Sequence, residues 1–128
     1  MTTPFWCLVL VMFLPIPLAL AGIPVRIRAL GEFDNKHPRL QRRSLEGMPA
    51  RLSSAQENSW EATILFAITV IVTHLAGLDP EVAAPWAIAF VVLRLVFVTL
   101  YLLNLDVLRS LTFVASLIVL VRMLALAA

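Results

Sequence analysis

The sequence predicts an all-α integral membrane protein, and three observations lead to that fold class. Of its 128 residues, 61% are hydrophobic and 14% are charged, whereas soluble domains contain about 25% charged residues. Four apolar stretches occupy most of the chain, each close to the roughly 20 residues that a membrane-spanning helix needs. None of them alternates with the period of two that is typical of a barrel strand. Since backbone amides in lipid must bond within their own segment, we expect a four-helix bundle.

A single domain over residues 1–128 accommodates these stretches. The predicted helices cover about residues 4–26, 53–77, 81–104 and 107–127, and a polar loop covers about residues 27–52. Ala19-Leu20-Ala21 before Gly22 resembles a signal-peptidase site, but the N-terminus lacks the basic segment of a signal peptide. We therefore interpret the first stretch as a helix that Pro15 and Pro17 bend.

Basic residues are concentrated in the first predicted loop. It carries Arg26, Arg28, Lys36, Arg39, Arg42, Arg43 and Arg51, whereas the second loop holds only Asp79 and Glu81. The positive-inside rule then places the first and third loops in the cytoplasm and both termini outside, in the inner membrane of a bacterium. The same distribution accounts for the pI of about 9.3, so we expect the lipid bilayer and no nucleic acid as a partner. With one cysteine, Cys7, and two distant histidines, we expect neither a disulfide nor a metal site.

Polar residues within the spans are the candidate functional groups, because they are costly in lipid. On the second predicted helix, Arg51, Ser54, Asn58 and Glu61 are spaced to share one face. On the third helix, Arg94 and Tyr101 are seven residues apart, and Arg109-Ser110 opens the fourth helix at the cytoplasmic side. Three helices thus bring polar groups to the same half of the bilayer.

This inventory suits a small zwitterion with several carboxylates. Arg94 and Arg109 are permanently charged donors suited to carboxylates, and the start of a helix favours an anion or a thiolate. The alternative is that these groups bond to one another: Glu61 pairs with Arg94, and the cluster only holds the bundle together. The residues alone leave both interpretations open.

Several segments together resemble the MAPEG family, the membrane-associated proteins in eicosanoid and glutathione metabolism. These are Asn58-Ser-Trp-Glu61, Arg94 followed by Tyr101, Arg109-Ser110, Phe33-Asp-Asn-Lys-His-Pro-Arg39 and Ala55-Gln-Glu-Asn-Ser-Trp-Glu-Ala62. The two longer segments are similar to the bacterial, uncharacterised branch. The resemblance extends over nearly the whole chain and includes the four apolar stretches.

The resemblance implies a homotrimer that binds glutathione between subunits and a glutathione transferase or peroxidase activity on small lipophilic electrophiles. Arg109 matches the arginine that stabilises the glutathione thiolate. The positions that match glutathione contacts are Arg51, Asn58, Glu61, Arg94, Tyr101 and Ser110. The chain departs from enzymatic relatives at Ser54 and Glu57, where several carry arginines, and at Phe97, where some carry a polar residue.

Two other functions remain as alternatives. A non-catalytic lipid-binding or accessory member of the family would bind ligands without turnover, and the missing arginines favour it. A small multidrug exporter also has four short helices and one membrane glutamate, but cation export needs a carboxylate without competing positive charge. Arg94 and Arg109 argue against the exporter.

Overall fold

The computed structural model describes residues 1–128 and contains helices and no strands. The helices are α1 (Thr3–Phe13), α2 (Pro15–Leu30), α3 (Pro38–Arg43), α4 (Gly47–Leu75), α5 (Pro80–Leu102) and α6 (Asp106–Ala127). Helices α1 and α2 follow one another as a single broken rod, so the molecule has four rods long and apolar enough to cross a membrane. The predicted fold class is therefore confirmed.

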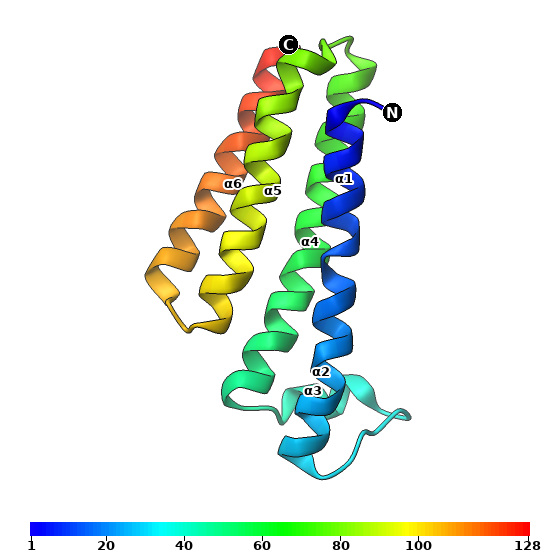
Figure 1. Ribbon diagram of the computed structural model, residues 1–128, viewed down its shortest axis with the longest axis vertical. Coiled ribbons are helices and arrows are strands. Elements are labelled where there is room, and N and C mark those ends of the chain that lie inside the picture. Colours follow the sequence, from blue (N-terminus) through cyan, green and yellow to red (C-terminus); the bar gives the residue numbers. More distant parts are fainter.

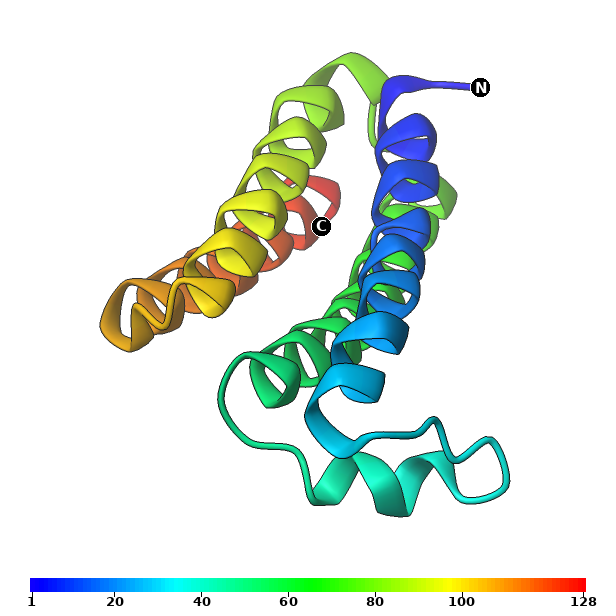
Figure 2. The ribbon, with the colours of Figure 1, turned by 60° about the horizontal axis from the view of Figure 1, so that its bottom comes forward.

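Helix α4 is the centre of the bundle. It packs against α1, α2, α5 and α6, whereas α5 and α6 form a close pair along most of their length. Both termini lie at one end of the molecule, and the segment containing α3 lies at the other (Figure 1). Seen after rotation, the α5–α6 hairpin diverges from α2 and α4 toward the α3 end (Figure 2).

The first rod is interrupted at Leu14, between α1 and α2, directly before Pro15, where the sequence predicts a bend. Leu14 keeps right-handed helical dihedrals, φ −57° and ψ −39°, so the interruption is one of hydrogen bonding. Pro15 has no N–H to donate to the Val11 carbonyl, and that carbonyl instead accepts from the Leu14 amide at 3.2 Å. The hydroxyl of Thr63 on α4 also approaches it, with Oγ1 3.2 Å from the Val11 oxygen. A carbonyl freed by proline is thus used to join the first rod to α4.

The two short turns between the long helices have the same hydrogen-bond pattern. After α4, the Leu78 amide donates to the Thr73 carbonyl around Gly77, whose φ is 83°. After α5, the Leu105 amide donates to the Leu100 carbonyl around Asn104, whose φ is 61°. Both are Schellman motifs, which need one residue in the left-handed region. The second one fixes where α6 begins relative to α5.

The main cluster of buried apolar side chains lies in the half of the bundle that contains the termini. Its members are Cys7, Val11, Ala62, Phe66, Val70, Ala83, Ala87, Phe90, Val119, Leu120 and Met123. At its centre, the rings of Phe66 and Phe90 stack between α4 and α5 with centroids 4.3 Å apart. No residue between Leu14 and Glu61 belongs to this cluster, so the other half is free to accommodate polar side chains.

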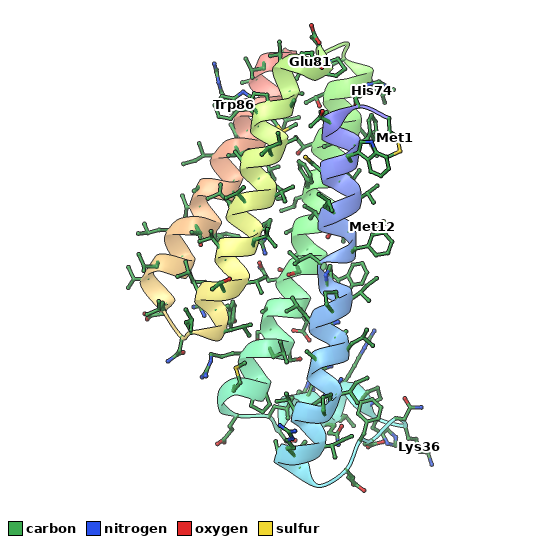
Figure 3. The ribbon with its side chains drawn as sticks, in the orientation of Figure 1. Met1, Met12, Lys36, His74, Glu81 and Trp86 are labelled. Carbon is green, nitrogen blue, oxygen red and sulfur yellow. The ribbon has the colours of Figure 1, made fainter.

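The loop differs from its prediction in two respects. Helix α4 begins at Gly47 instead of near residue 53, and the short helix α3 lies within the segment expected to be irregular. The side chain of Gln41 accounts for part of this order, because it donates to the Glu32 carbonyl at 2.8 Å and accepts from the Asp34 amide at 3.2 Å. Lys36 lies at the tip of this loop, at the opposite end from Glu81 and Trp86 (Figure 3).

Candidate functional site

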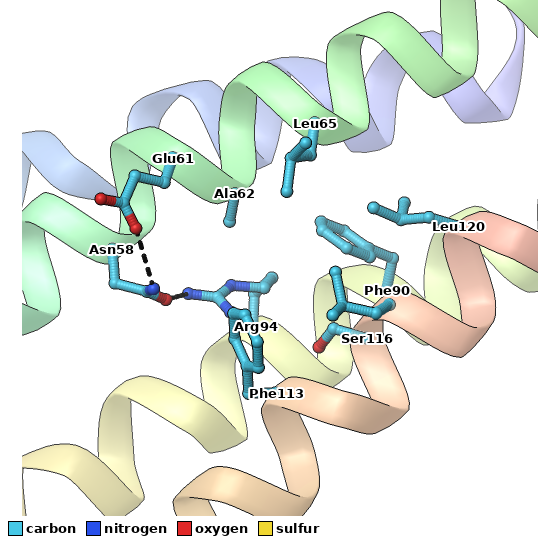
Figure 4. Close-up of a pocket in the computed structure, with 10 residues that line it drawn as sticks. Asn58, Glu61, Ala62, Leu65, Phe90, Arg94, Phe113, Ser116 and Leu120 are labelled. Carbon is cyan, nitrogen blue, oxygen red and sulfur yellow. Dashed lines mark hydrogen bonds between the residues drawn. The ribbon is translucent and has the colours of Figure 1, made fainter.

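Three of the predicted site residues form one hydrogen-bonded chain between α4 and α5. Arg94 Nη2 donates to Asn58 Oδ1 at 2.6 Å, and Asn58 Nδ2 donates to Glu61 Oε2 at 3.2 Å (Figure 4). The prediction that these helices bring polar groups together is confirmed for this trio. Glu61 and Arg94 form no direct ion pair; the amide of Asn58 lies between them and makes one hydrogen bond to each.

Arg94 is the most deeply placed charged side chain of the molecule. It is 1% exposed, and its Nε is a buried donor without an acceptor. A cavity of about 80 Å³ adjoins it, with Leu65, Phe90 and Leu120 among its apolar walls. A buried donor without a partner costs free energy, and this cavity has room for a water molecule or a polar ligand atom. The site therefore retains an unused hydrogen-bond donor beside an apolar space.

Together with Tyr101, Phe97 connects the two predicted cationic residues, Arg94 and Arg109. Phe97 is not among the predicted site residues. The Arg94 guanidinium lies 4.3 Å from the Phe97 ring centroid, and that ring meets Tyr101 edge-on at 5.6 Å. The Arg109 guanidinium in turn lies 4.3 Å from the Tyr101 ring centroid. The spacing i+3 from Arg94 and i−4 from Tyr101 already places Phe97 on their shared face. The result is a row in which two adjacent aromatic rings lie between two cations, along α5 and onto α6.

The sequence predicts Arg109 and Ser110 at the opening of the fourth helix. In the structure they lie one turn inside α6. The helix begins at Asp106, and the Arg109 amide already donates to the Leu105 carbonyl at 3.0 Å. The Asp106 carboxylate accepts from the Val107 amide at 2.9 Å, so a negative group of the chain itself occupies the positive end of the helix. The Val107 and Arg109 amides are thus engaged within the chain, and the Arg109 side chain is the cation at this end of the helix.

A shallow recess of about 340 Å³ surrounds the start of α6. Asp106, Arg109 and Ser110 supply its polar side, and Val107, Leu111 and Val114 supply its apolar side. The Ser110 hydroxyl is engaged by the Asp106 carbonyl at 3.0 Å. The recess therefore presents one guanidinium next to an apolar wall on the outside of the protomer.

Arg51 lies apart from both groups. Its Nε donates to the Leu102 carbonyl at 3.4 Å, which ties the start of α4 to the last turn of α5. Lysine and arginine side chains near a helix C-terminus satisfy carbonyls that lack helical partners. In the single protomer, this predicted ligand-binding residue holds two helices together.

Ser54 and Glu57 face a different recess from the one around Arg94. They line a groove between α3 and α4 together with Arg42. Glu57 Oε1 lies 3.3 Å from Arg42 Nη1 in an ion pair. Its negative charge is therefore partly compensated there by Arg42.

The sequence profile of the MAPEG family matches residues 3–128, essentially the whole chain. Comparison with curated proteins and with solved structures finds no match. The four apolar rods and the polar cluster between α4 and α5 agree with the order of segments that carried the resemblance. The chain belongs to the MAPEG family.

Proposed function

We propose that this protein is a membrane-bound glutathione transferase or peroxidase that acts on small lipophilic electrophiles. The observation that carries the proposal is the position of Arg109, whose half-exposed guanidinium is held over Tyr101 beside the apolar wall of the recess. In the transferase reaction, the glutathione thiol loses its proton to solvent. The thiolate sulfur then forms a bond to the electrophilic carbon as the leaving group departs with its electron pair. A nearby cation favours the thiolate.

The remaining glutathione contacts in this proposal are Arg51, Asn58, Glu61, Arg94, Tyr101 and Ser110. The free Nε of Arg94 fits a carboxylate or carbonyl oxygen of the peptide, and Glu61 fits its ammonium group. Arg109 faces the outside of the protomer, and α6 carries exposed apolar side chains such as Leu111 and Ile118. Both features support a homotrimer in which a neighbouring copy closes the site.

The proposed orientation places the basic loop in the cytoplasm and both termini outside a bacterial inner membrane. The concentration of arginine at the α3 end and of Asp79 and Glu81 at the opposite end supports it. Glutathione would then reach the site from the cytoplasm.

The test is calorimetric titration of the detergent-purified full chain with glutathione. We expect saturable binding that Arg109→Ala weakens. Arg122→Ala serves as the matched control, because it removes an arginine from the same helix at the far end, where Arg122 lies over Trp86 at 5.8 Å. S-methylglutathione, which has no thiolate, should bind wild type and the Arg109→Ala variant alike. Absence of binding at millimolar glutathione would contradict the proposal.

A second candidate is a lipid-binding or accessory member without turnover. One observation favours it: Asn58 already bonds to one nitrogen of Arg94 and to Glu61 within the protomer, so glutathione contacts to these atoms would have to displace existing bonds. Ligand binding without conjugate formation in the presence of an electrophile would support this second function.

A further inference from the structure

The groove between α3 and α4 is the largest recess of the protomer and lies outside the row from Arg94 to Arg109. It has a volume of about 810 Å³, within the range of small-molecule sites. Arg39, Arg42 and Arg43 from the loop line one side, and Ser53 and Ser54 of α4 line the other.

The charge of this groove is mostly uncompensated. Arg42 is paired with Glu57, but Arg39 and Arg43 form no ion pair and no side-chain hydrogen bond. The groove thus presents three guanidinium groups against one carboxylate. Planar guanidinium forks match the oxygens of a phosphate group.

The two serines opposite these arginines are unusual among the hydroxyl side chains of the long helices. The other serines and threonines of α4, α5 and α6 donate to a carbonyl one turn earlier: Ser59, Thr63, Thr69, Thr73, Thr99, Ser110, Thr112 and Ser116. Ser53 and Ser54 make no such bond, although both are half-buried in the wall of the groove. Their hydroxyls are available to a ligand.

Apolar side chains at the edge of the groove favour a lipid as its ligand over a soluble anion. Trp60 lines the groove and is 42% exposed, and Leu40, between the arginines of α3, is 60% exposed. Tryptophan is enriched at the level of lipid headgroups, and basic clusters beside a spanning helix attract anionic lipids. We propose that this groove binds the phosphate headgroup of an anionic phospholipid, with the arginines and the two serine hydroxyls around the phosphate and Trp60 beside the glycerol region.

The experiment uses the full chain reconstituted in phosphatidylcholine vesicles that contain a minor fraction of phosphatidylglycerol. A Trp6→Phe/Trp86→Phe background leaves Trp60 as the only tryptophan. Brominated acyl chains on one lipid or the other then report which lipid lies next to Trp60. We expect brominated phosphatidylglycerol to quench Trp60 more strongly than brominated phosphatidylcholine at the same mole fraction.

Variants separate a site from diffuse attraction. Arg39→Gln/Arg43→Gln should reduce the preference for phosphatidylglycerol by more than about tenfold for each lost guanidinium, because hydrogen bonds to a charged acceptor add to the attraction between charges. Arg28→Gln/Lys36→Gln removes two positive charges outside the groove, one at the end of α2 and one in the loop that follows it, and should cost only the smaller, diffuse attraction. Ser53→Ala/Ser54→Ala changes no charge and should reduce it about tenfold, because hydrogen bonds to charged acceptors are the stronger kind.

Three results would overturn the proposal. Equal losses in the two charge variants would mean that the loop attracts anionic lipid diffusely. An unchanged preference for phosphatidylglycerol in the serine variant would show that the two hydroxyls do not bind the headgroup. Relief of quenching by inorganic phosphate or by glutathione would assign the groove to a soluble anion. Circular dichroism and thermal unfolding in detergent confirm that each variant is folded before it is compared.

Discussion

Arg94 on α5 and Asn58 on α4 are joined by a 2.6 Å hydrogen bond inside the bundle. The neutral amide of Asn58 accepts a hydrogen bond from the guanidinium, as a carboxylate would. Its burial costs less free energy, because an amide carries a smaller desolvation penalty than a second buried charge. Because its own N–H donates to Glu61, Asn58 also connects the buried cation to an exposed anion without bringing the two into contact. The arrangement of the cluster therefore depends on Asn58.

Asn58→Ala should lower the free energy of unfolding by about 2 kcal/mol, because it removes an acceptor from a buried guanidinium. Chemical unfolding of the detergent-purified protein measures the change. Asn35→Ala, in the exposed loop, is the matched control and should leave stability within experimental error. Equal stability of the Asn58→Ala variant and wild type would mean that Arg94 finds another partner, such as water in the adjoining cavity.

Thr63 and Pro15 should be energetically coupled through the Val11 carbonyl. Thr63→Val removes the hydroxyl that lies 3.2 Å from this oxygen and should destabilise the protein by about 1 kcal/mol. In a Pro15→Ala background the new amide can donate to the same carbonyl, so the Thr63→Val change should cost less. A double-mutant cycle with a coupling of about 0.5 kcal/mol or more is expected. Strict additivity would show that the hydroxyl acts only through its second acceptor, the Ser59 carbonyl at 2.8 Å.

The spans and the convergence of polar groups were predictable from the sequence for a physical reason. Lipid forces each apolar stretch into a helix, and the spacing of residues along a helix then determines which of them share a face. Asn58, Glu61 and Arg94 meet in the structure because their helices cross the bundle side by side. The interruption of the first rod at Leu14 follows equally from the missing amide of Pro15.

Other features depend on tertiary contacts that no local pattern contains. Helix α3 is stabilised by Gln41, whose partners lie as many as nine residues away, and its six residues are too few to form a helix alone. The partner of Glu57 is Arg42, 15 residues distant, so the sequence could not indicate that this carboxylate faces the groove. The spacing of Phe97 from Arg94 and Tyr101 places it on their face, but only the structure shows its ring in contact with the Arg94 guanidinium.

Asn104 should control the position of Arg109 relative to Tyr101. It is the only residue other than glycine with a positive φ, 61°, and it closes the turn between α5 and α6. Asn104→Gly should keep or slightly raise stability, since glycine adopts this conformation without strain. Asn104→Val should lower stability by about 1–2 kcal/mol, because a β-branched side chain clashes in the left-handed region.

The two Asn104 variants also test whether the turn positions the site. If it does, Asn104→Val weakens any glutathione binding together with stability, and Asn104→Gly preserves both. Loss of binding in both variants would instead show that the asparagine side chain itself contacts the ligand. Calorimetric titration and unfolding of the same samples distinguish these results.

The loop that precedes α3 should lose local order in acid because of Asp34. The His37 amide, followed by the Lys36 amide, donates to this carboxylate at 2.8 Å, and these bonds hold the pKa of Asp34 below its usual 3.8. Since the pKa is lowered in the folded loop, the stabilisation is fully present above the unfolded pKa and is lost as the pH falls through the lowered value. Neutral pH therefore favours the ordered turn.

Amide hydrogen exchange of Lys36 and His37 provides the measurement. In wild type, protection of the two amides should persist down to about pH 4 and decrease below it. Asp34→Ala should lack this protection at every pH, whereas Asp34→Asn, which keeps an acceptor oxygen but cannot ionise, should show weaker protection without the acid transition. The Glu81 amide, which donates to Asp79 Oδ1 at 2.9 Å at the other end of the bundle, should be unaffected by either variant. An acid transition that persisted in Asp34→Asn would assign the pH dependence to a different group.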